Sequence, residues 1–211
     1  NGGHGHAGGE LKMALELLPD FIRDAYEVHE WKHASAVLAQ DFHEEWADIV
    51  DILTDFRLKK SWIEVGGKNK SAVSKQIDSE FYSRGWEEKQ FATSIVVDGE
   101  ATESPTHKVD CFKKRIALEI EWNNKDPFFD RDLNNFRLLF DLRVASVGVI
   151  ITRCDELQEI FDDIGRGSSF GNSTTHMSKL LPRISGGSGG GCPLLVFGIS
   201  RPLAAIIGTI T

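Results

Sequence analysis

Hydrophobic and polar residues alternate along residues 115–122, and this period of two predicts a β-strand. Isoleucine and leucine side chains occupy one face of this strand, whereas Glu119 and Glu121 share the opposite face. Fully apolar runs predict buried strands at 147–152 and 193–200.

Other segments place apolar residues three and four positions apart, which predicts amphipathic helices. They are residues 10–27 with a break at Pro19, 34–56 as one helix or as two with a break near Asp41, 72–84, 130–144, 155–165 and 173–184. A further strand is predicted at 91–97. The predicted helices come first in the chain, and strands then alternate with helices. The apolar strands must be covered by other elements on both faces of the sheet. The order of elements therefore predicts an α/β fold, with α+β as the alternative, built on a central mixed sheet flanked by helices.

The length of 211 residues is enough for one domain with a sizeable core. We expect residues 10–211 to form that domain, and the glycine- and histidine-containing residues 1–9 to be disordered or tag-like. The glycine-rich residues 185–191 are interpreted as a loop beside a site, because only one strand-sized segment follows them.

The net charge of −8 argues against a protein that coats nucleic acid without sequence preference, because such binding needs lysine and arginine. It permits a local basic cleft that also holds a metal. The three cysteines lack the spacing of a zinc site, and their number favours reduced thiols and a cytoplasmic location. No apolar run is long enough to cross a membrane.

The acidic residues of the 115–122 strand suggest a metal site. Mg²⁺ prefers carboxylate and carbonyl oxygens, which Asp110, Glu119 and the Ile120 carbonyl could supply, while Glu121 could orient or deprotonate a water. Spacing alone is more typical of the solvated face of an antiparallel sheet. Lysine and arginine before the acids, and tryptophan and asparagine after them, favour a partly buried charged site.

Several segments carry side chains that could contact DNA. Asparagine, serine, threonine and histidine can bond base edges, and lysine and arginine can bind guanine or phosphate, but turns, helix caps and core packing remain equally open. The candidates are Lys68, Asn69, Lys70, Ser71, Asn123, Asn124, Ser173, Thr174, Thr175, His176, Lys179 and Arg183.

The spacing D-x8-E-x-E resembles the PD-(D/E)xK nuclease signature, with glutamate in place of the usual lysine. The segment 109–129 resembles the catalytic segment of restriction endonucleases of the BglII and BstYI type. Residues 29–38, 84–89 and 192–199 resemble further motifs of that family in the same order. Glu121 departs from the family, in which glutamine stands at this position.

The resemblance implies a type II restriction endonuclease that binds double-stranded DNA as a homodimer and cuts a short palindrome, one containing GATC by analogy. It implies Mg²⁺ as the cofactor, with Mn²⁺ able to substitute, held by Asp110, Glu119 and the Ile120 carbonyl. Glu121 would position or activate the attacking water. The alternatives are a nuclease of the same core without sequence preference, and a DNA-binding module without catalysis.

Overall fold

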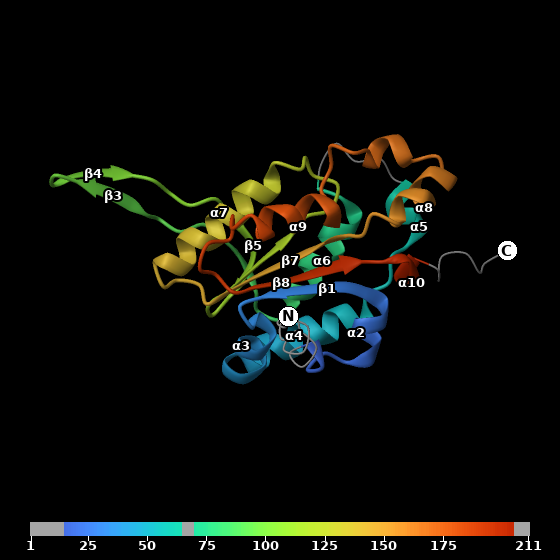
Figure 1. Ribbon diagram of the computed structural model, residues 1–211, viewed down its shortest axis with the longest axis horizontal. Helices are drawn as coiled ribbons and strands as arrows, with labels where there is room; N and C mark the ends of the chain where they lie inside the picture. Colours follow the sequence, from blue (N-terminus) through green and yellow to red (C-terminus); the bar gives the residue numbers. More distant parts are fainter. Residues whose placement is uncertain (1–14, 65–69, 205–211) are drawn as a thin grey trace, which may run out of the picture.

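The computed structural model describes residues 15–64 and 70–204, and these form a six-stranded mixed sheet with helices on both faces. The strand order is β1-β8-β7-β6-β5-β2 (Figure 1). Strands β6, β7 and β8 are parallel, and the remaining pairs are antiparallel. The strands span Tyr26–Trp31 (β1), Glu87–Lys89 (β2), Val109–Lys113 (β5), Ile116–Ile120 (β6), Val147–Arg153 (β7) and Leu194–Ile199 (β8). This confirms the predicted α/β fold.

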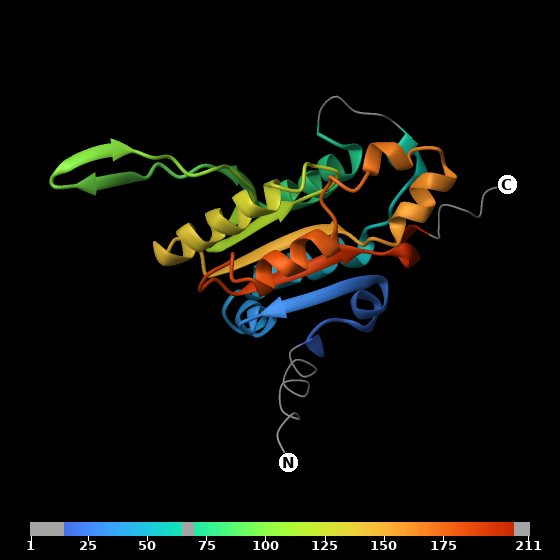
Figure 2. The ribbon, with the colours of Figure 1, turned by 45° about the horizontal axis from the view of Figure 1, so that its top comes forward.

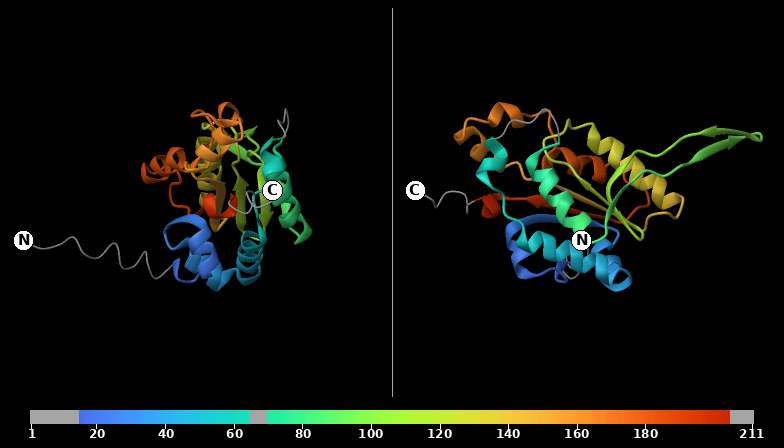
Figure 3. Two further views of the ribbon diagram at one scale, coloured as in Figure 1. Left: turned by 90° about the vertical axis from the view of Figure 1, so that its right-hand side faces the viewer. Right: turned by 180° about the vertical axis from the view of Figure 1, so that it is seen from behind.

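The helices form two layers, one on each face of the sheet (Figures 2 and 3). One layer holds α2 (Asp20–Ala25), α3 (Ala34–Asp41), α4 (His43–Asp55), α5 (Lys60–Glu64), α6 (Ala72–Ser83), α8 (Leu157–Asp163), the 3-10 helix η1 (Gly167–Phe170) and α10 (Arg201–Ala204). The other layer holds α7 (Phe128–Asp141) and α9 (Met177–Ser185). Within the described residues, no helix is long and apolar enough to cross a membrane.

Every residue of β6 is buried, because the strand lies between the two layers. Ile116, Leu118 and Ile120 pack into the larger apolar cluster, while Ala117 faces the smaller cluster under α7 and α9. Glu119 follows Ala117 on that second face by the strand period of two. The sequence pattern therefore placed the glutamates on the correct face, but that face is covered rather than solvated.

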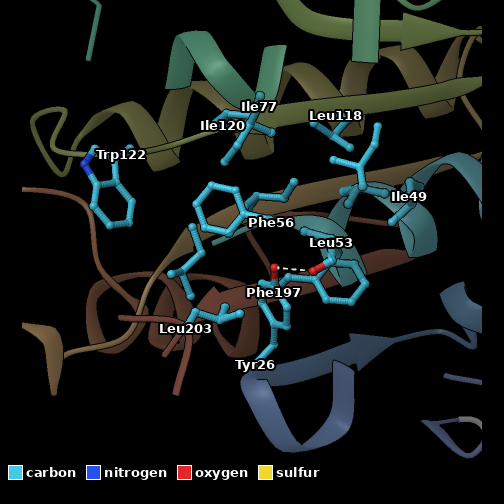
Figure 4. Packing of buried hydrophobic residues seen from close by; sticks show 14 of the residues in the cluster. Tyr26, Ile49, Leu53, Phe56, Ile77, Leu118, Ile120, Trp122, Phe197 and Leu203 are labelled. Carbon is cyan, nitrogen blue, oxygen red and sulfur yellow. Dashed lines mark hydrogen bonds between the residues drawn. The ribbon is translucent and has the colours of Figure 1, made fainter. Parts of the chain in front are cut away.

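The larger cluster packs side chains of α4 and α10 against the sheet, as Figure 4 shows. Tyr26 at the start of β1 packs edge-on against Phe197 of β8, with ring centroids 6.3 Å apart. Its hydroxyl donates a hydrogen bond of 2.7 Å to the carbonyl of Leu53 in α4. This buried bond ties the helical layer to the outer strand of the sheet.

Two sequence-based expectations for strands were wrong or incomplete. Residues 91–97 were expected to form a strand, but only Ser94–Val97 (β3) is one, and it pairs with Glu100–Glu103 (β4) in a separate two-stranded sheet. Strand β1 was not predicted, since its sequence YEVHEW carries Glu27, His29 and Glu30 among six residues. The proposed tag-like residues 1–9 lie outside the described residues.

Gly148 lets α7 approach β7 closely, and this contact offers a test of the packing. We expect Gly148→Ala to lower the free energy of unfolding by about 1–3 kcal/mol, because overpacking displaces core side chains. An added Cβ would lie 2.5 Å from Phe136 Cδ2 and 2.8 Å from Leu194 Cδ2. Urea unfolding measures the loss. Gly171→Ala is the matched control, since its Cβ would meet only the Ser168 carbonyl, at 3.7 Å. An equal loss in both variants would contradict this account.

Candidate functional site

The β5–β6 hairpin brings Asp110 and Glu119 together. Cys111 pairs with Leu118 in the antiparallel register, so Asp110 lies opposite Glu119 on the neighbouring strand. The backbone N–H of Asp110 donates to Glu119 Oε2 at 3.2 Å, and the N–H of Ile120 donates to Asp110 Oδ2 at 3.0 Å. Each carboxylate is thereby held by the backbone of the opposite strand.

Glu121 lies immediately after β6, where the chain leaves the sheet. Its N–H donates to the Ile151 carbonyl, and its own carbonyl accepts from the Thr152 hydroxyl, so its backbone is fixed against β7. Its carboxyl group accepts from Asn124 Nδ2 at 2.8 Å and from Arg131 Nη2 at 3.3 Å. Glu119 and Glu121 are each only 1% exposed, so the interpretation as a solvated sheet face is wrong.

Asp132 of α7 is a fourth acid of the site, and the sequence analysis missed it. It is completely buried, and Arg131 Nη2 lies 2.7 Å from its Oδ1. Within residues 15–64 and 70–204, its Oδ2 has no hydrogen-bond partner. The signal was present in the sequence, because Asp132 stands four residues before Phe136, on the apolar side of the helix.

Burial of these acids disfavours their charged forms. Loss of solvent, followed by the nearby charges of Asp132 and Asp110, raises the pKa of Glu119 well above its usual value. Burial and then Asp132 raise the pKa of Glu121 to about 9, and the pKa of Asp132 is also raised, mainly by burial. The site thus concentrates carboxyl groups that a cation would stabilise in their ionised forms.

The acids fit a divalent cation. Glu119 Oε1 is buried without a hydrogen-bond partner in the part of the chain that the structure describes, and Asp110 lies across the hairpin from it. Over residues 15–64 and 70–204, no group of three histidine, cysteine, aspartate or glutamate side chains is arranged to hold a metal by itself. A cation here would therefore draw on two carboxylates and the Ile120 carbonyl, with water and phosphate completing its shell, as Mg²⁺ commonly does.

Lys70 reaches the same site from the start of α6. Its Nζ lies 2.5 Å from Asp78 Oδ2 and 3.2 Å from Asp110 Oδ1. Hydrogen bonding to Asp78 and the charge of Asp110 raise the pKa of Lys70, against the opposing effect of burial. Of the neighbouring candidates, Ser71 instead caps α6 by accepting from the Ser74 N–H, and residues 68 and 69 lie outside the described residues.

The structure brings two of the candidate DNA-contacting segments together. The N–H of Thr175 donates to the Asn124 carbonyl at 2.9 Å, and the Asn124 N–H donates to Thr175 Oγ1 at 3.2 Å. Residues 125 and 174 form an isolated β-bridge beside them. Asn123 has a left-handed backbone, with φ of 60°, which turns the chain after Glu121. The two segments therefore form one surface next to the acids.

Within this surface, exposed and buried candidates differ. Ser173 is exposed, whereas Thr174, Thr175 and His176 are buried. His176 Nδ1 lies 2.7 Å from Asp155 Oδ1. Lys179 is partly exposed, and Arg183 is tied to Asp130 by an ion pair of 2.9 Å. The buried members support the loop, and the exposed members remain available to a ligand.

Arg153 is a second functional candidate that the sequence analysis missed. It ends β7 with only 2% exposure, and its Nη2 donates to the Phe170 carbonyl and to Thr174 Oγ1. Burial lowers the pKa of Arg153 to about 10. It lines a pocket of about 420 Å³ together with Asp155, Gln158, Phe170, Gly171, Asn172 and His176. Arg153 thus anchors the loop that precedes α9.

Comparison with protein-family models gives a match to "Restriction endonuclease BglII/BglIII" over residues 26–199. This match covers more than half of the chain. The chain belongs to this family. No curated protein matches it. Membership makes the chain a type II site-specific deoxyribonuclease, a DNA-binding hydrolase of a restriction system, and confirms the resemblance noted in the sequence. Enzymes of this kind generally use divalent metal ions.

The matched region contains all four acids and both candidate DNA-contacting segments described here. The expectation of a DNA-binding module without catalysis is therefore set aside, as is that of a nuclease without sequence preference. The roles of the individual residues are predictions that rest on the geometry above.

A stability measurement tests whether Glu119 is kept for function at a cost to folding. We expect Glu119→Gln to raise the free energy of unfolding of the metal-free protein by about 1 kcal/mol at pH 7.5, because glutamine carries no charge to bury. Thermal unfolding is measured with EDTA and with Mg²⁺. Added Mg²⁺ should raise the melting temperature of the wild type and leave that of Glu119→Gln unchanged.

Exposed Glu80 of α6 provides the control, since its side chain lies in solvent and bonds only Gln76 in the same helix. Glu80→Gln should change neither the melting temperature in EDTA nor the response to Mg²⁺. A Glu119→Gln variant that is less stable than the wild type without metal would overturn the interpretation.

Proposed function

We propose that this endonuclease cuts both strands of a short palindrome, one containing GATC, in a reaction that depends on Mg²⁺, with Mn²⁺ able to substitute. The observation that carries the proposal is the cross-strand pair of partly exposed Asp110 and buried Glu119, beside buried Glu121 and Asp132. Two copies would act together, one on each strand, in the cytoplasm.

Asp110 and Glu119 would hold the metal, helped by the Ile120 carbonyl. A bound divalent cation supplies charge stabilisation at the phosphate and a more acidic water. The hydrogen bond from Ile120 N–H fixes Asp110 Oδ2, so Oδ1 is the oxygen that faces Lys70 and remains for a ligand. Glu119 Oε1, unlike Asp110 Oδ1, has no hydrogen-bond partner among the described residues.

Glu121 would hold the attacking water by a hydrogen bond. Its carboxyl group is kept in place by Asn124 and Arg131. Arg131 also contacts Asp132, so one cation holds both acids beside the metal ligands.

DNA contacts would come from the surface that joins residues 122–126 to the loop before α9. Asn123, Ser173 and Lys179 would reach DNA directly, with Asn124 and Arg183 holding the surface beside the acids. Thr174, Thr175 and His176, although candidates for base contact, face inward and would position their exposed neighbours. Lys70, and by the same proposal Lys68, Asn69 and Ser71, would lie along the scissile strand.

Incubation with phage DNA tests the function as a whole. Purified protein is mixed with DNA and Mg²⁺ or Mn²⁺, with an EDTA control, and the products are separated on a gel. Discrete metal-dependent bands are expected, and sequencing of their ends gives the site. A metal-dependent smear would contradict cutting at a palindrome, and equal cutting in EDTA would contradict the metal dependence.

Replacement of Glu119 tests the site. We expect Glu119→Ala to lower the cleavage rate by at least about 10²-fold, because a metal ligand is lost, while DNA binding measured with Ca²⁺ stays within a few fold of wild type. Glu80→Ala should cut at the wild-type rate. If Glu119→Ala cut DNA at the wild-type rate, Glu119 would not be a metal ligand of the reaction and the site assignment would be wrong.

Replacement of Lys70 has two opposite expected effects. Lys70 Nζ occupies Asp110 Oδ1 in the absence of metal, so Lys70→Met should bind Mg²⁺ more tightly when DNA is absent. The same change removes a cation beside the scissile phosphate, so cleavage should fall about tenfold or more. Isothermal titration and single-turnover cleavage measure the two effects.

Lys75→Met, on the exposed side of α6, is the control and should change neither quantity. Lys70→Met also leaves buried Asp78 without its ion pair, so the double variant Lys70→Met/Asp78→Asn separates loss of stability from loss of activity. Weaker Mg²⁺ binding in both Lys70 variants would show that the lysine supports the metal site rather than competing with the metal.

A further inference from the structure

Arg153 is a buried cation without a counter-ion. Its side chain is 2% exposed, and over residues 15–64 and 70–204 no carboxylate lies within ion-pair distance of its guanidinium. Burial lowers the pKa of Arg153 to about 10, so the group still carries its charge at pH 7. Buried charges in folded proteins are normally paired, because an unpaired charge loses its hydration without replacement. An anion that binds from solution would supply the missing partner.

The anchoring of the loop before α9 uses only part of this guanidinium. Both hydrogen bonds, to the Phe170 carbonyl at 2.8 Å and to Thr174 Oγ1 at 3.1 Å, come from Nη2. Nε and Nη1 donate to no atom of the described residues. The ring centroids of Phe161 and Phe170 lie 5.5 and 6.0 Å from the guanidinium carbon, which offsets the charge only weakly. The rest of the guanidinium is therefore left for a ligand.

The cavity of about 420 Å³ that Arg153 lines, here called the Arg153 pocket, has room for a small oxyanion. Asp155 is the acid of this pocket, but its carboxylate is already engaged. It accepts from the N–H and the hydroxyl of Ser178 at 3.0 and 2.6 Å, and its Oδ1 lies 2.7 Å from His176 Nδ1. Asn172 lines the same pocket and is exposed, which places its amide at the rim. The pocket thus offers a buried cation and a free amide to a ligand.

We propose that the Arg153 pocket binds one phosphate group, with Arg153 as its counter-ion and the Asn172 amide as a second donor. A guanidinium suits this ligand because its planar N–H groups match the spacing of phosphate oxygens. Nothing in this assignment depends on the residues of the acid site.

The phosphate group has two candidate sources. The loop of the pocket is bonded to the segment beside the acids, since Asp126 N–H donates to the Ser173 carbonyl at 3.0 Å and Thr175 N–H to the Asn124 carbonyl. A backbone phosphate of bound DNA, away from the cleaved bond, is therefore one source, and this choice rests on the proposed function. A free phosphate compound is the other source.

Titration of the full chain with inorganic phosphate, in EDTA and without DNA, tests the site. At constant ionic strength, the ¹H–¹⁵N signal of the Arg153 Nε–H group should shift and reach saturation, because the guanidinium gains a partner. An Arg153 signal that does not respond to phosphate would overturn the proposal.

Substitution of Asn172 tests the pocket without altering the hydrogen bonds of Arg153. Asn172→Asp should weaken phosphate binding by at least about threefold, and Asn172→Lys should strengthen it by a similar factor, because each adds a charge at the rim. Asn134→Asp is the matched control, since Asn134 is exposed on α7 and does not line the pocket, and it should leave phosphate binding within about 1.5-fold of wild type. Equal effects of Asn172→Asp and Asn134→Asp would overturn the proposal.

Competition with DNA separates the two sources. The phosphate titration is repeated in EDTA with a saturating duplex that carries the cleavage site, and a gel shift verifies that the duplex is bound. Loss of the Arg153 response would assign the pocket to a backbone phosphate, whereas an unchanged response would overturn DNA as the source and leave a free phosphate compound. Metal-dependent cutting at discrete sites by a protein that binds no phosphate would overturn the pocket alone and leave the nuclease assignment intact.

Discussion

The rest of the site depends on the reciprocal pair of hydrogen bonds across the β5–β6 hairpin. Glu119 accepts from the backbone of Asp110, and Asp110 accepts from the backbone of Ile120. Both donors are backbone N–H groups, so the strand register determines where the two carboxylates are held. The hydrophobic pattern of β6 fixes that register in turn, since a slip by one residue would bring Ile120 to the face under α7 and turn Glu119 into the larger apolar cluster.

Burying several acids in one place opposes folding, and the two helical layers offset this by supplying one cation each. Lys70 comes from the start of α6 and contacts Asp110, while Arg131 comes from α7 on the opposite face and contacts Glu121 and Asp132. The cations approach from opposite sides and leave Glu119 Oε1 unpaired between them. The compensation is thus incomplete at the position where a metal would bind, which suits a site that must release and rebind its ligands.

Sequence patterns predicted the elements in which the order of apolar residues reflects burial, and they failed where charged side chains are buried. Strands β6, β7 and β8 were predicted because they are apolar and covered on both faces. Strand β1 was hidden by its charged residues, of which Glu30 is buried and accepts from the Ser35 N–H and hydroxyl. The acids of the hairpin were found from spacing, but Asp132 comes from a helix twenty-two residues beyond Asp110, and only the tertiary fold brings it near.

Glu121 differs from the glutamine that the resemblance leads one to expect, yet its surroundings reduce the difference. Burial raises its pKa to about 9, so the side chain is neutral near pH 7 in the metal-free protein. A protonated glutamate and a glutamine have nearly the same shape, and each can donate one hydrogen bond and accept another. Asn124 and Arg131 donate to the carboxyl oxygens, as they could to the amide oxygen of a glutamine. Burial, together with the nearby charge of Asp132, therefore explains how an acid can replace an amide at this position without adding a charge to a crowded site.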